Sequence, residues 1–286
     1  MPDLAALVLH LRAARPALID QHLGRALQAF VLRRILEPYD AGLSAALHRA
    51  GGEARPYTAH GLFTRAGTLL RGEIAYGEEA WLRVSALRAD VGAALEAYAA
   101  RMPAQIEIDR QPWIVTQLVW DDDWSGRSTY PALSRPHIYA PPPGALRLHF
   151  AAPTAFHSGG LNFPLPDPRL VFGSLAQRWA AFSPLPLPDE LNEFVTHFVA
   201  LGRFNLESHL LRFKQGSRHI GFCGHVRYLI LPENPKLSKN DPARAAALAQ
   251  KHDDLARALA LLTDFAFYSG VGIKTTTGMG LARPVV

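Results

Sequence analysis

Two stretches of the chain share one residue pattern, and they constrain the fold more than any other feature. Residues 6–13 read ALVLHLRA, and residues 145–152 read ALRLHFAA. Both alternate apolar and other residues, which is typical of a strand buried on one face. Each stretch precedes a helical pattern, one at residues 20–36 and one starting at Asp167 and Pro168, where aspartate suits the N-cap and proline the first helical position. The pattern indicates two similar halves.

Each half continues with strands, a second helix and further strand material. In the first half we expect strands at residues 55–63, 68–76, 80–86, 104–108 and 112–120 and a helix at 87–102. In the second half we expect strands at residues 203–213, 218–231 and 281–286 and a helix at 243–268. A repeated strand–helix–strand unit is the split βαβ plan of ferredoxin-like folds. The predicted fold class is therefore α+β, with two tandem ferredoxin-like (RRM-like) domains.

A proline-rich segment at residues 139–144 predicts a stiff linker between the halves. A chain of 286 residues has the length of two ordinary domains. We therefore expect an N-terminal domain over residues 1–138 and a C-terminal domain over residues 139–286.

The net charge of +5 comes from the second half of the chain. Residues 1–140 contain 15 Lys and Arg against 15 Asp and Glu, whereas residues 141–286 contain 15 against 10. Seven basic and two acidic residues fall within residues 203–239. A basic half favours a polyanionic partner, and a solvated face is the plainer alternative.

The remaining composition excludes several classes of protein. No run of 18 apolar residues predicts a membrane span, and the N-terminus lacks the basic region of a signal peptide. The single cysteine, Cys223, has no internal disulfide partner, and no Cys/His ligand spacing predicts a metal site. We therefore expect a cytoplasmic protein without a metal, a cofactor or a membrane partner.

A glycine-rich segment, SGVGIKTTTGMG at residues 269–280, lies near the end of the chain. Glycine permits positive φ and close backbone approach, and exposed N–H groups beside Lys274 would form an anion site. No helix is predicted after the segment, so it matches neither the dinucleotide fingerprint nor the P-loop. The interpretations left open are a phosphate cradle, a flexible hairpin, and a loop whose glycines let it pack on the protein itself.

A short helix is predicted over residues 41–50, with Asp40 as its N-cap and Gly51 just past its end. Pro38 ends the helix before it. His48 therefore falls in the last turn, where the helix dipole favours the protonated imidazole. Such a histidine either transfers protons in catalysis or only complements the dipole.

Several motifs together resemble a known family. They are the G-x-G-x5-G-x-G ending, GFCGHVRY at residues 221–228, LHFAAPTAF at 148–156, and LSAALH at 43–48 followed by RPYTAHGLF at 55–63. These motifs resemble the CRISPR RNA-processing endoribonucleases of the RAMP (repeat-associated mysterious protein) superfamily. The resemblance implies metal-independent cleavage of CRISPR repeat RNA by attack of a 2′-OH on the adjacent phosphate. The implied products carry a 2′,3′-cyclic phosphate and a 5′-OH.

The resemblance also implies roles for particular residues. His48 matches the catalytic histidine of the family, and the second proton carrier is expected to be His22 or Tyr39. Relatives with a catalytic tyrosine have it where this chain has Arg33, which departs from their pattern. Arg55 corresponds most nearly to a catalytic lysine of those relatives, and its permanent charge suits electrostatic stabilisation rather than proton transfer.

The expected partner is CRISPR repeat RNA. Its phosphates are expected to contact the glycine-rich segment and four basic side chains. The residues of the segment are Gly270, Gly272, Lys274, Gly278 and Gly280. The four basic side chains are Arg178, Arg212, Lys214 and Arg227. Subunits of a CRISPR effector complex and a second copy of the chain are further expected partners. The first alternative to a repeat-cleaving endoribonuclease is a non-catalytic RNA-binding RAMP subunit of an effector complex. The second alternative is a nucleotide-binding enzyme.

Overall fold

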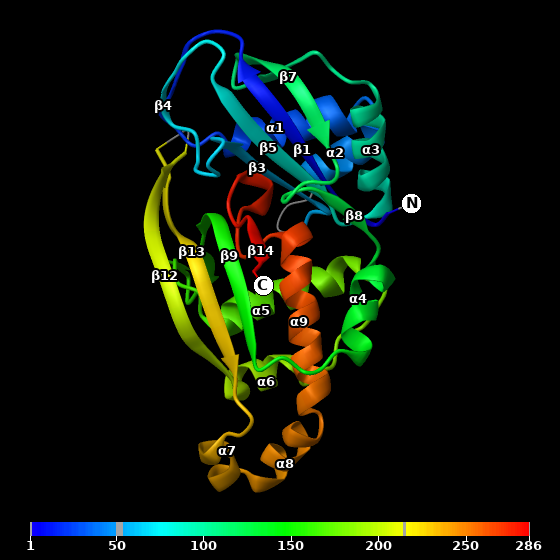
Figure 1. Ribbon diagram of the computed structural model, residues 1–286, viewed down its shortest axis with the longest axis vertical. Helices are drawn as coiled ribbons and strands as arrows, with labels where there is room; N and C mark the ends of the chain where they lie inside the picture. Colours follow the sequence, from blue (N-terminus) through cyan, green and yellow to red (C-terminus); the bar gives the residue numbers. More distant parts are fainter. Residues whose placement is uncertain (1, 50–53, 214–215, 286) are drawn as a thin grey trace.

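The computed structural model describes residues 2–49, 54–213 and 216–285. Figure 1 shows two halves stacked along the long axis of the molecule, each with a sheet and its own helices. A small helical lobe, coloured orange, projects from the far end of the C-terminal half and contains α7 (Pro235–Asn240) and α8 (Pro242–Gln250).

The N-terminal half is built on an antiparallel sheet with the strand order β3-β5-β1-β7-β6, to which β8 adds by pairing with β1. Its strands are β1 (Leu4–Ala13), β3 (Tyr57–Phe63), β5 (Glu79–Ala86), β6 (Gln105–Ile108), β7 (Gln111–Val119) and β8 (Gly126–Ser128), with β2 (Ala17–Ile19) and β4 (Gly72–Ile74) paired separately. Its helices are α1 (Gly24–Phe30), which continues as the π-helical η1 (Val31–Leu36), then α2 (Ala41–Arg49) and α3 (Ala89–Ala100).

The C-terminal half has a four-stranded antiparallel sheet with the order β12-β13-β9-β14. Its strands are β9 (Ala145–Thr154), β12 (Val199–Arg212), β13 (Arg218–Ile230) and β14 (Ala282–Pro284), with β10 (Phe156–Ser158) and β11 (Leu161–Phe163) as a separate hairpin. The helices packed with it are α4 (Tyr130–Tyr139), α5 (Pro168–Phe182), α6 (Leu191–Phe198) and α9 (His252–Ser269).

The two sheets have the same topology. In each half the first strand, β1 or β9, lies between the third and fourth strands of the unit, and the second strand lies outside the third. A helix follows the first strand and another follows the third, namely α1 and α3 in one half and α5 and α9 in the other. This arrangement is ferredoxin-like in both halves, so the predicted fold class is confirmed.

Differences from the predicted elements have local causes. The strand expected at residues 68–76 shortens to β4, because Gly67 and Gly72 on either side of Leu69–Arg71 take positive φ values of 81° and 84°. The helix expected at residues 243–268 is divided at Lys251, whose φ of −101° and ψ of 5° are not helical. The sequence did not predict α4, where Pro136 lies inside the helix and obscures its pattern.

Helix α4 packs against α9, and Tyr130 at its start is buried in the core of the C-terminal half. His137 of α4 also pairs with Asp264 of α9, with 2.8 Å between Nε2 and Oδ2. The division of the chain at residues 138 and 139 stays a prediction.

A buried arginine joins the two halves. Arg83 of β5 donates to the carbonyl oxygens of Trp124 and Phe267, both at 2.6 Å, and to Ser85 Oγ at 2.8 Å. Phe267 belongs to the last turns of α9, where helix carbonyls lack intrahelical partners. A guanidinium of the N-terminal half therefore caps a helix of the C-terminal half.

We predict that Asp167→Ala lowers the free energy of unfolding by about 1 kcal/mol at neutral pH, because it removes the N-cap of α5. Asp167 Oδ1 accepts a hydrogen bond from Arg169 N at 2.8 Å, and the hydrogen bond from the Arg169 side chain lowers the pKa of the carboxyl. A lowered pKa means that this stabilisation is present above the ordinary value and disappears as the pH falls below it.

Chemical denaturation from pH 7 down to pH 3 checks this prediction, with the exposed Asp189→Ala as a control. The difference between wild type and Asp167→Ala is expected to shrink at the acid end. A difference that stays constant with pH, or that appears equally in Asp189→Ala, would contradict the capping role.

Candidate functional site

His48 lies on a short helix whose start follows the predicted signal. Asp40 Oδ1 accepts a hydrogen bond from Leu43 N at 3.0 Å and caps α2. Ser44 and Leu47 are buried, and Ser44 Oγ donates to the carbonyl of Leu32 at 2.9 Å, which fixes α2 against η1. His48 occupies the last turn and is exposed to solvent. The glycine expected to end the helix, Gly51, lies outside the described residues.

An open cleft of about 660 Å³ lies between α2 and the helix formed by α1 and η1. His48 lines this cleft together with three exposed arginines, Arg25, Arg33 and Arg49, and with Gln28. Guanidinium groups bind phosphate oxygens in a bidentate manner, and an imidazole among them can exchange protons with the bound group. We call this space the His48 cleft.

Sequence reasoning did not single out Arg25, Gln28 or Arg49 as site residues. Arg25 and Gln28 are three positions apart and therefore share one face of α1, which was an available signal. This spacing indicates a site only once the structure shows that α2 lies across the cleft from that face.

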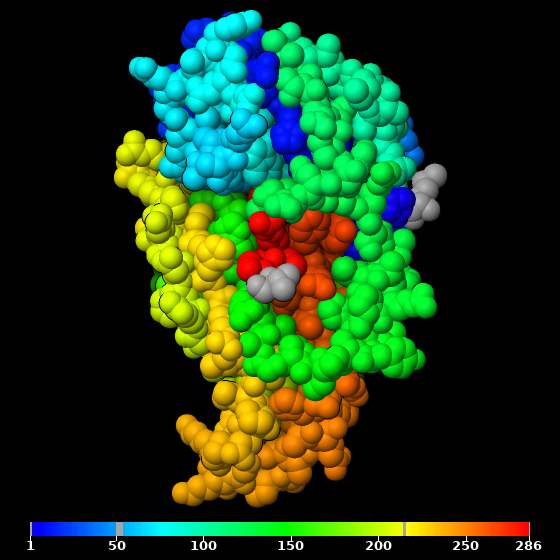
Figure 2. Space-filling view, viewed as in Figure 1, coloured from blue at the N-terminus to red at the C-terminus, as the bar shows by residue number. Residues whose placement is uncertain are grey.

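The glycine-rich segment lies in the seam between the two halves, coloured red in Figure 2. Its short 3-10 turn, η2 (Thr275–Thr277), packs against α1 and β3. Gln28 Nε2 donates to Thr276 Oγ1 at 3.4 Å, although the two residues are 248 positions apart. One side chain therefore touches both the segment and the His48 cleft.

Side chains from both halves hold the carbonyl groups of this segment. His22 Nε2 donates to Thr277 O at 2.8 Å, and His60 Nε2 donates to Met279 O at 3.0 Å. Arg178 donates to Ser269 O at 2.9 Å, to Gly272 O at 2.7 Å and to Thr275 Oγ1 at 2.7 Å. Arg178, expected to contact RNA, thus holds the segment in this structure.

The glycines of the segment approach other backbone atoms closely. A β-carbon added at Gly272 would lie 2.3 Å from Ala155 O, and one added at Gly280 would lie 2.1 Å from Val271 O. The N–H groups of Gly270, Gly272 and Gly280 donate to Ala266 O, Ser174 Oγ and Pro153 O. This geometry favours the interpretation that these glycines let the segment pack on the protein. Lys274 remains exposed, with Nζ 5.3 Å from the centre of the Phe213 ring.

His22 precedes α1 and is largely enclosed. Its ring lies edge-on to Phe213 at 4.8 Å between centroids. Burial lowers the pKa of His22 to about 4, and the positive charges of Arg71 and Lys274 act in the same direction, against the hydrogen bond to Thr277. The imidazole is therefore neutral at pH 7. Since Nε2 donates to a carbonyl, Nδ1 is the nitrogen that can accept a proton.

The other predicted site residues lie outside the lining of the His48 cleft. Tyr39 is 44% exposed in the turn between η1 and α2, and Arg55 is half-buried just before β3. Arg212 lines a small hollow of about 310 Å³ at the end of β12, and Arg227 is exposed on β13. Lys214 lies outside the described residues. The functional roles expected of these residues stay predictions.

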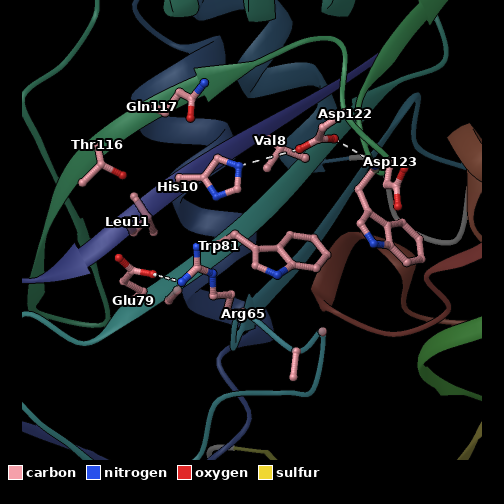
Figure 3. Close-up of a pocket in the computed structure, with 14 residues that line it drawn as sticks. Val8, His10, Leu11, Arg65, Glu79, Trp81, Thr116, Gln117, Asp122 and Asp123 are labelled. Atoms are coloured by element: carbon pink, nitrogen blue, oxygen red, sulfur yellow. Dashed lines mark hydrogen bonds and ion pairs between the residues drawn. The ribbon is translucent and has the colours of Figure 1, made fainter.

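A second site, not predicted from the sequence, lies between the faces of the two sheets. Figure 3 shows its N-terminal part, a hollow of about 490 Å³ in which His10 of β1 points toward Asp122, with 3.7 Å between Nε2 and Oδ2. An adjoining hollow of about 500 Å³ is lined by His149 and His225 of the C-terminal sheet. Trp124 lines both hollows. We call the two together the inter-sheet cleft.

Five neighbouring rings lead from the buried Phe63 into the inter-sheet cleft, and all of them except Phe63 line it. The centroid distances are 4.4 Å for Phe63–Trp81, 5.9 Å for Trp81–Trp124, 6.1 Å for Trp124–His149 and 4.3 Å for His149–His225. The rings come from both halves and are far apart in the sequence, so no local sequence pattern predicts that they lie together.

Within residues 2–49, 54–213 and 216–285, no three His, Cys, Asp or Glu side chains are grouped in a way that would hold a metal ion. In the same described part, no helix combines the length and the apolar character needed to cross a membrane.

Known proteins share both the sequence and the whole fold. The family model for CRISPR-associated endoribonuclease Cas6 matches residues 148–282. A Cas6 solved as a product complex is 28% identical, with a TM-score of 0.75 over 99% of both chains. The chain is similar to the Cas6 endoribonucleases, in sequence over residues 148–282 and in fold over its whole length. The predicted relationship to repeat-processing RAMP proteins is thereby confirmed.

Two further Cas6 proteins extend the comparison. The Cas6 endoribonuclease of Mycobacterium tuberculosis is 33% identical over 140 residues, a match that spans 48% of this chain and 38% of that protein's length. A Cas6 of Thermus thermophilus, 23% identical with a TM-score of 0.70 over 100% of this chain and 99% of its own, agrees in fold.

We predict that the His22 imidazole of this Cas6-like protein stays neutral down to about pH 4. Protonation would place a charge in a buried site beside other cations, which raises its free energy. Titration of the ¹⁵N-histidine resonances, with the His22 signal assigned by its loss in His22→Gln, measures this value. Titration of the assigned signal near the ordinary value of 6.5 would contradict the buried, neutral state.

Proposed function

We propose that the chain is an endoribonuclease that cleaves CRISPR repeat RNA without a metal ion, through attack of a 2′-OH on the adjacent phosphate. The observation that carries this proposal is the His48 cleft, where an exposed imidazole and three arginines meet beside the glycine-rich segment of a chain that is similar to Cas6. Related Cas6 structures were solved as product and substrate-mimic complexes, and one as a histidine-to-alanine mutant. These related complexes and this variant support an RNA substrate and an important histidine.

In the proposed reaction His22 is the base and His48 is the acid. His22 is neutral at pH 7, and its Nδ1 would remove the proton from the attacking 2′-OH. His48 lines the cleft from the last turn of α2, and in this reaction it would donate a proton to the leaving 5′-oxygen. The products would be a 2′,3′-cyclic phosphate and a 5′-OH. His22 and Tyr39 both lie outside the lining of the cleft. His22 contacts the glycine-rich segment at Thr277, next to the Thr276–Gln28 hydrogen bond that joins this segment to the cleft.

The arginines of the His48 cleft would stabilise the transition state. Negative charge accumulates on the phosphate oxygens when five oxygens surround phosphorus, and fixed cations lower the free energy of that state. Arg25, Arg33 and Arg49 supply such charge from α1, η1 and α2. Exposed Lys274 extends the positive surface toward the glycine-rich segment.

The inter-sheet cleft is suited to unpaired bases of the same RNA. Stacking on aromatic rings binds single-stranded nucleic acid with little dependence on sequence. The Arg283 guanidinium lies 4.5 Å above the Trp124 ring and adds positive charge there. We therefore assign unpaired repeat nucleotides to this cleft and the scissile phosphate to the His48 cleft.

Cleavage of the cognate repeat RNA in EDTA tests the proposed activity. Wild type is expected to cut once per repeat, and His48→Ala is expected to be slower by about 10²–10⁴-fold, the usual contribution of a proton-transfer group. A 2′-deoxy substitution at the scissile nucleotide is expected to abolish cutting. Addition of Mg²⁺ serves as the control for metal dependence.

Three results would contradict parts of this mechanism. Full activity of His48→Ala would remove that residue from the reaction, and cutting of the 2′-deoxy RNA would exclude attack by the 2′-OH. Binding of repeat RNA without any cleavage would favour the alternative of a non-catalytic RAMP subunit. Contacts with effector subunits, self-association and a cytoplasmic location stay predictions.

Trp124→Ala is expected to weaken binding of repeat RNA by about 1–3 kcal/mol through loss of base stacking, with little change in the cleavage rate of the bound complex. Electrophoretic mobility shifts with 2′-deoxy RNA give the affinity, and single-turnover assays give the rate. Tyr139→Ala, at an exposed aromatic outside the cleft, is the matched control. Equal affinities for the two variants would contradict the assignment of bases to this cleft.

A further inference from the structure

Two glycines, one from each half, lie directly against the His22 ring. A β-carbon added at Gly24 of α1 would lie 1.9 Å from Thr277 O and 3.0 Å from His22 Nε2. A β-carbon added at Gly278 would lie 2.7 Å from His22 Nε2 and 2.8 Å from His22 Cε1. Side-chain carbons do not tolerate such distances, so only glycine fits at both positions without a shift of the ring or the backbone.

The contacts around this ring come from separate parts of the chain. Thr277 of the glycine-rich segment accepts the Nε2 hydrogen bond, and Phe213 packs against the ring. The backbone N–H of His22 donates to Arg212 O at 2.8 Å, which ties the residue to the end of β12. The ring is therefore held on its edges by the C-terminal half, although its own backbone leads into α1.

We propose that Gly24 and Gly278 form a slot that seats the His22 ring in the seam between the halves, and that both glycines are positioning residues for the reaction. Without a β-carbon, α1 and the segment approach each other until Thr277 O reaches Nε2. That contact fixes which nitrogen carries the proton and leaves Nδ1 as the acceptor. The same approach sets α1, and thus Arg25 and Gln28, against the His48 cleft.

The slot explains why the segment holds a glycine at residue 278. Gly278 has a φ of 90°, a conformation that glycine adopts readily. A positive φ by itself would explain a glycine at any exposed turn. Gly278 is buried, however, and the His22 imidazole occupies the space that a side chain at this position would need. The glycine therefore serves a histidine more than 250 residues earlier, as the separation of 255 between His22 and Thr277 illustrates.

The first test observes the slot without RNA. In Gly24→Ala and in Gly278→Ala the ring is expected to move toward solvent, so the pKa of His22 should rise from about 4 toward 6.5 in ¹⁵N-histidine titrations. Arg71, Lys274 and His219 are the charged or titratable groups acting on the ring, and none of them is altered. An unchanged His22 titration in both folded variants would overturn the proposal.

Matched glycine substitutions separate the slot from general effects on the backbone. Gly173→Ala changes a helical glycine of α5 where an added β-carbon meets nothing within 4 Å, and it is the control for Gly24→Ala. Gly77→Ala imposes similar strain at a φ of 79° with nothing within 4 Å, and it is the control for Gly278→Ala. Both controls are expected to keep the wild-type His22 titration. A shift of equal size in the controls would overturn the slot.

The second test is kinetic and rests on the proposed function. At saturating enzyme the single-turnover cleavage rate of Gly24→Ala and Gly278→Ala is expected to fall about 10²-fold, because a displaced base no longer meets the 2′-OH. Affinity for 2′-deoxy repeat RNA should change by less than about threefold, which marks loss in the bound state rather than in binding. A rate equal to wild type, with only the active fraction reduced, would overturn the positioning role.

His22→Gln and His22→Leu refine the same test. Glutamine can still donate an N–H to Thr277 O but cannot act as a base, so both variants are expected to lose cleavage while only glutamine keeps the wild-type thermal midpoint. Cleavage retained by His22→Gln would overturn the role of the slot in placing a base. If wild type itself does not cleave, the proposed function fails, and the titration alone decides whether the slot exists.

Discussion

The structure depends on one kind of contact, in which side chains of the N-terminal half donate hydrogen bonds to carbonyl groups at the end of the C-terminal half. Arg83 reaches Phe267, His60 reaches Met279 and His22 reaches Thr277. Carbonyls at a helix end and in the loop after it have no helical partners, and burial without partners is costly. Each half therefore completes the hydrogen bonding of the other. This mutual requirement fixes the relative orientation of two otherwise similar units.

The same seam determines the electrostatics of the buried His22. Burial keeps His22 neutral, whereas His48 and the arginines around it face water at the surface. A neutral imidazole and a group of exposed cations are thus held near one another because the continuous helix of α1 and η1 packs against the glycine-rich segment through α1 and against α2 through η1. On the other side of the seam, rings from the two sheets meet around Trp124. The inter-sheet cleft exists because the halves are held in one arrangement.

Local signals in the sequence predicted much of the fold. The alternation in β1 and β9, the cap at Asp167 and the cap at Asp40 each act through neighbouring residues, and each is found in the structure. The failures arose where local signals conflict or are weak. Pro136 disfavours a helix at α4 by local criteria, but packing against α9 stabilises it. Residues 243–268 have a composition typical of one continuous helix, but the backbone of Lys251 is not helical and divides it. The position of His48 was predictable because its helix is bounded by nearby residues.

By itself, the sequence determined the class of fold, the duplicated plan, the helix that carries His48 and the motifs of the family, because these follow from periodicity and short-range chemistry. Only the tertiary structure decided how the glycine-rich segment is used. Its carbonyls and N–H groups face partners that are distant in sequence, so Arg178 supports the segment and the glycines admit close packing. It also decided that Arg25, Gln28 and Arg49 join His48 and that four rings, Trp81, Trp124, His149 and His225, line the inter-sheet cleft. Such contacts depend on how whole elements pack, and no local pattern specifies them.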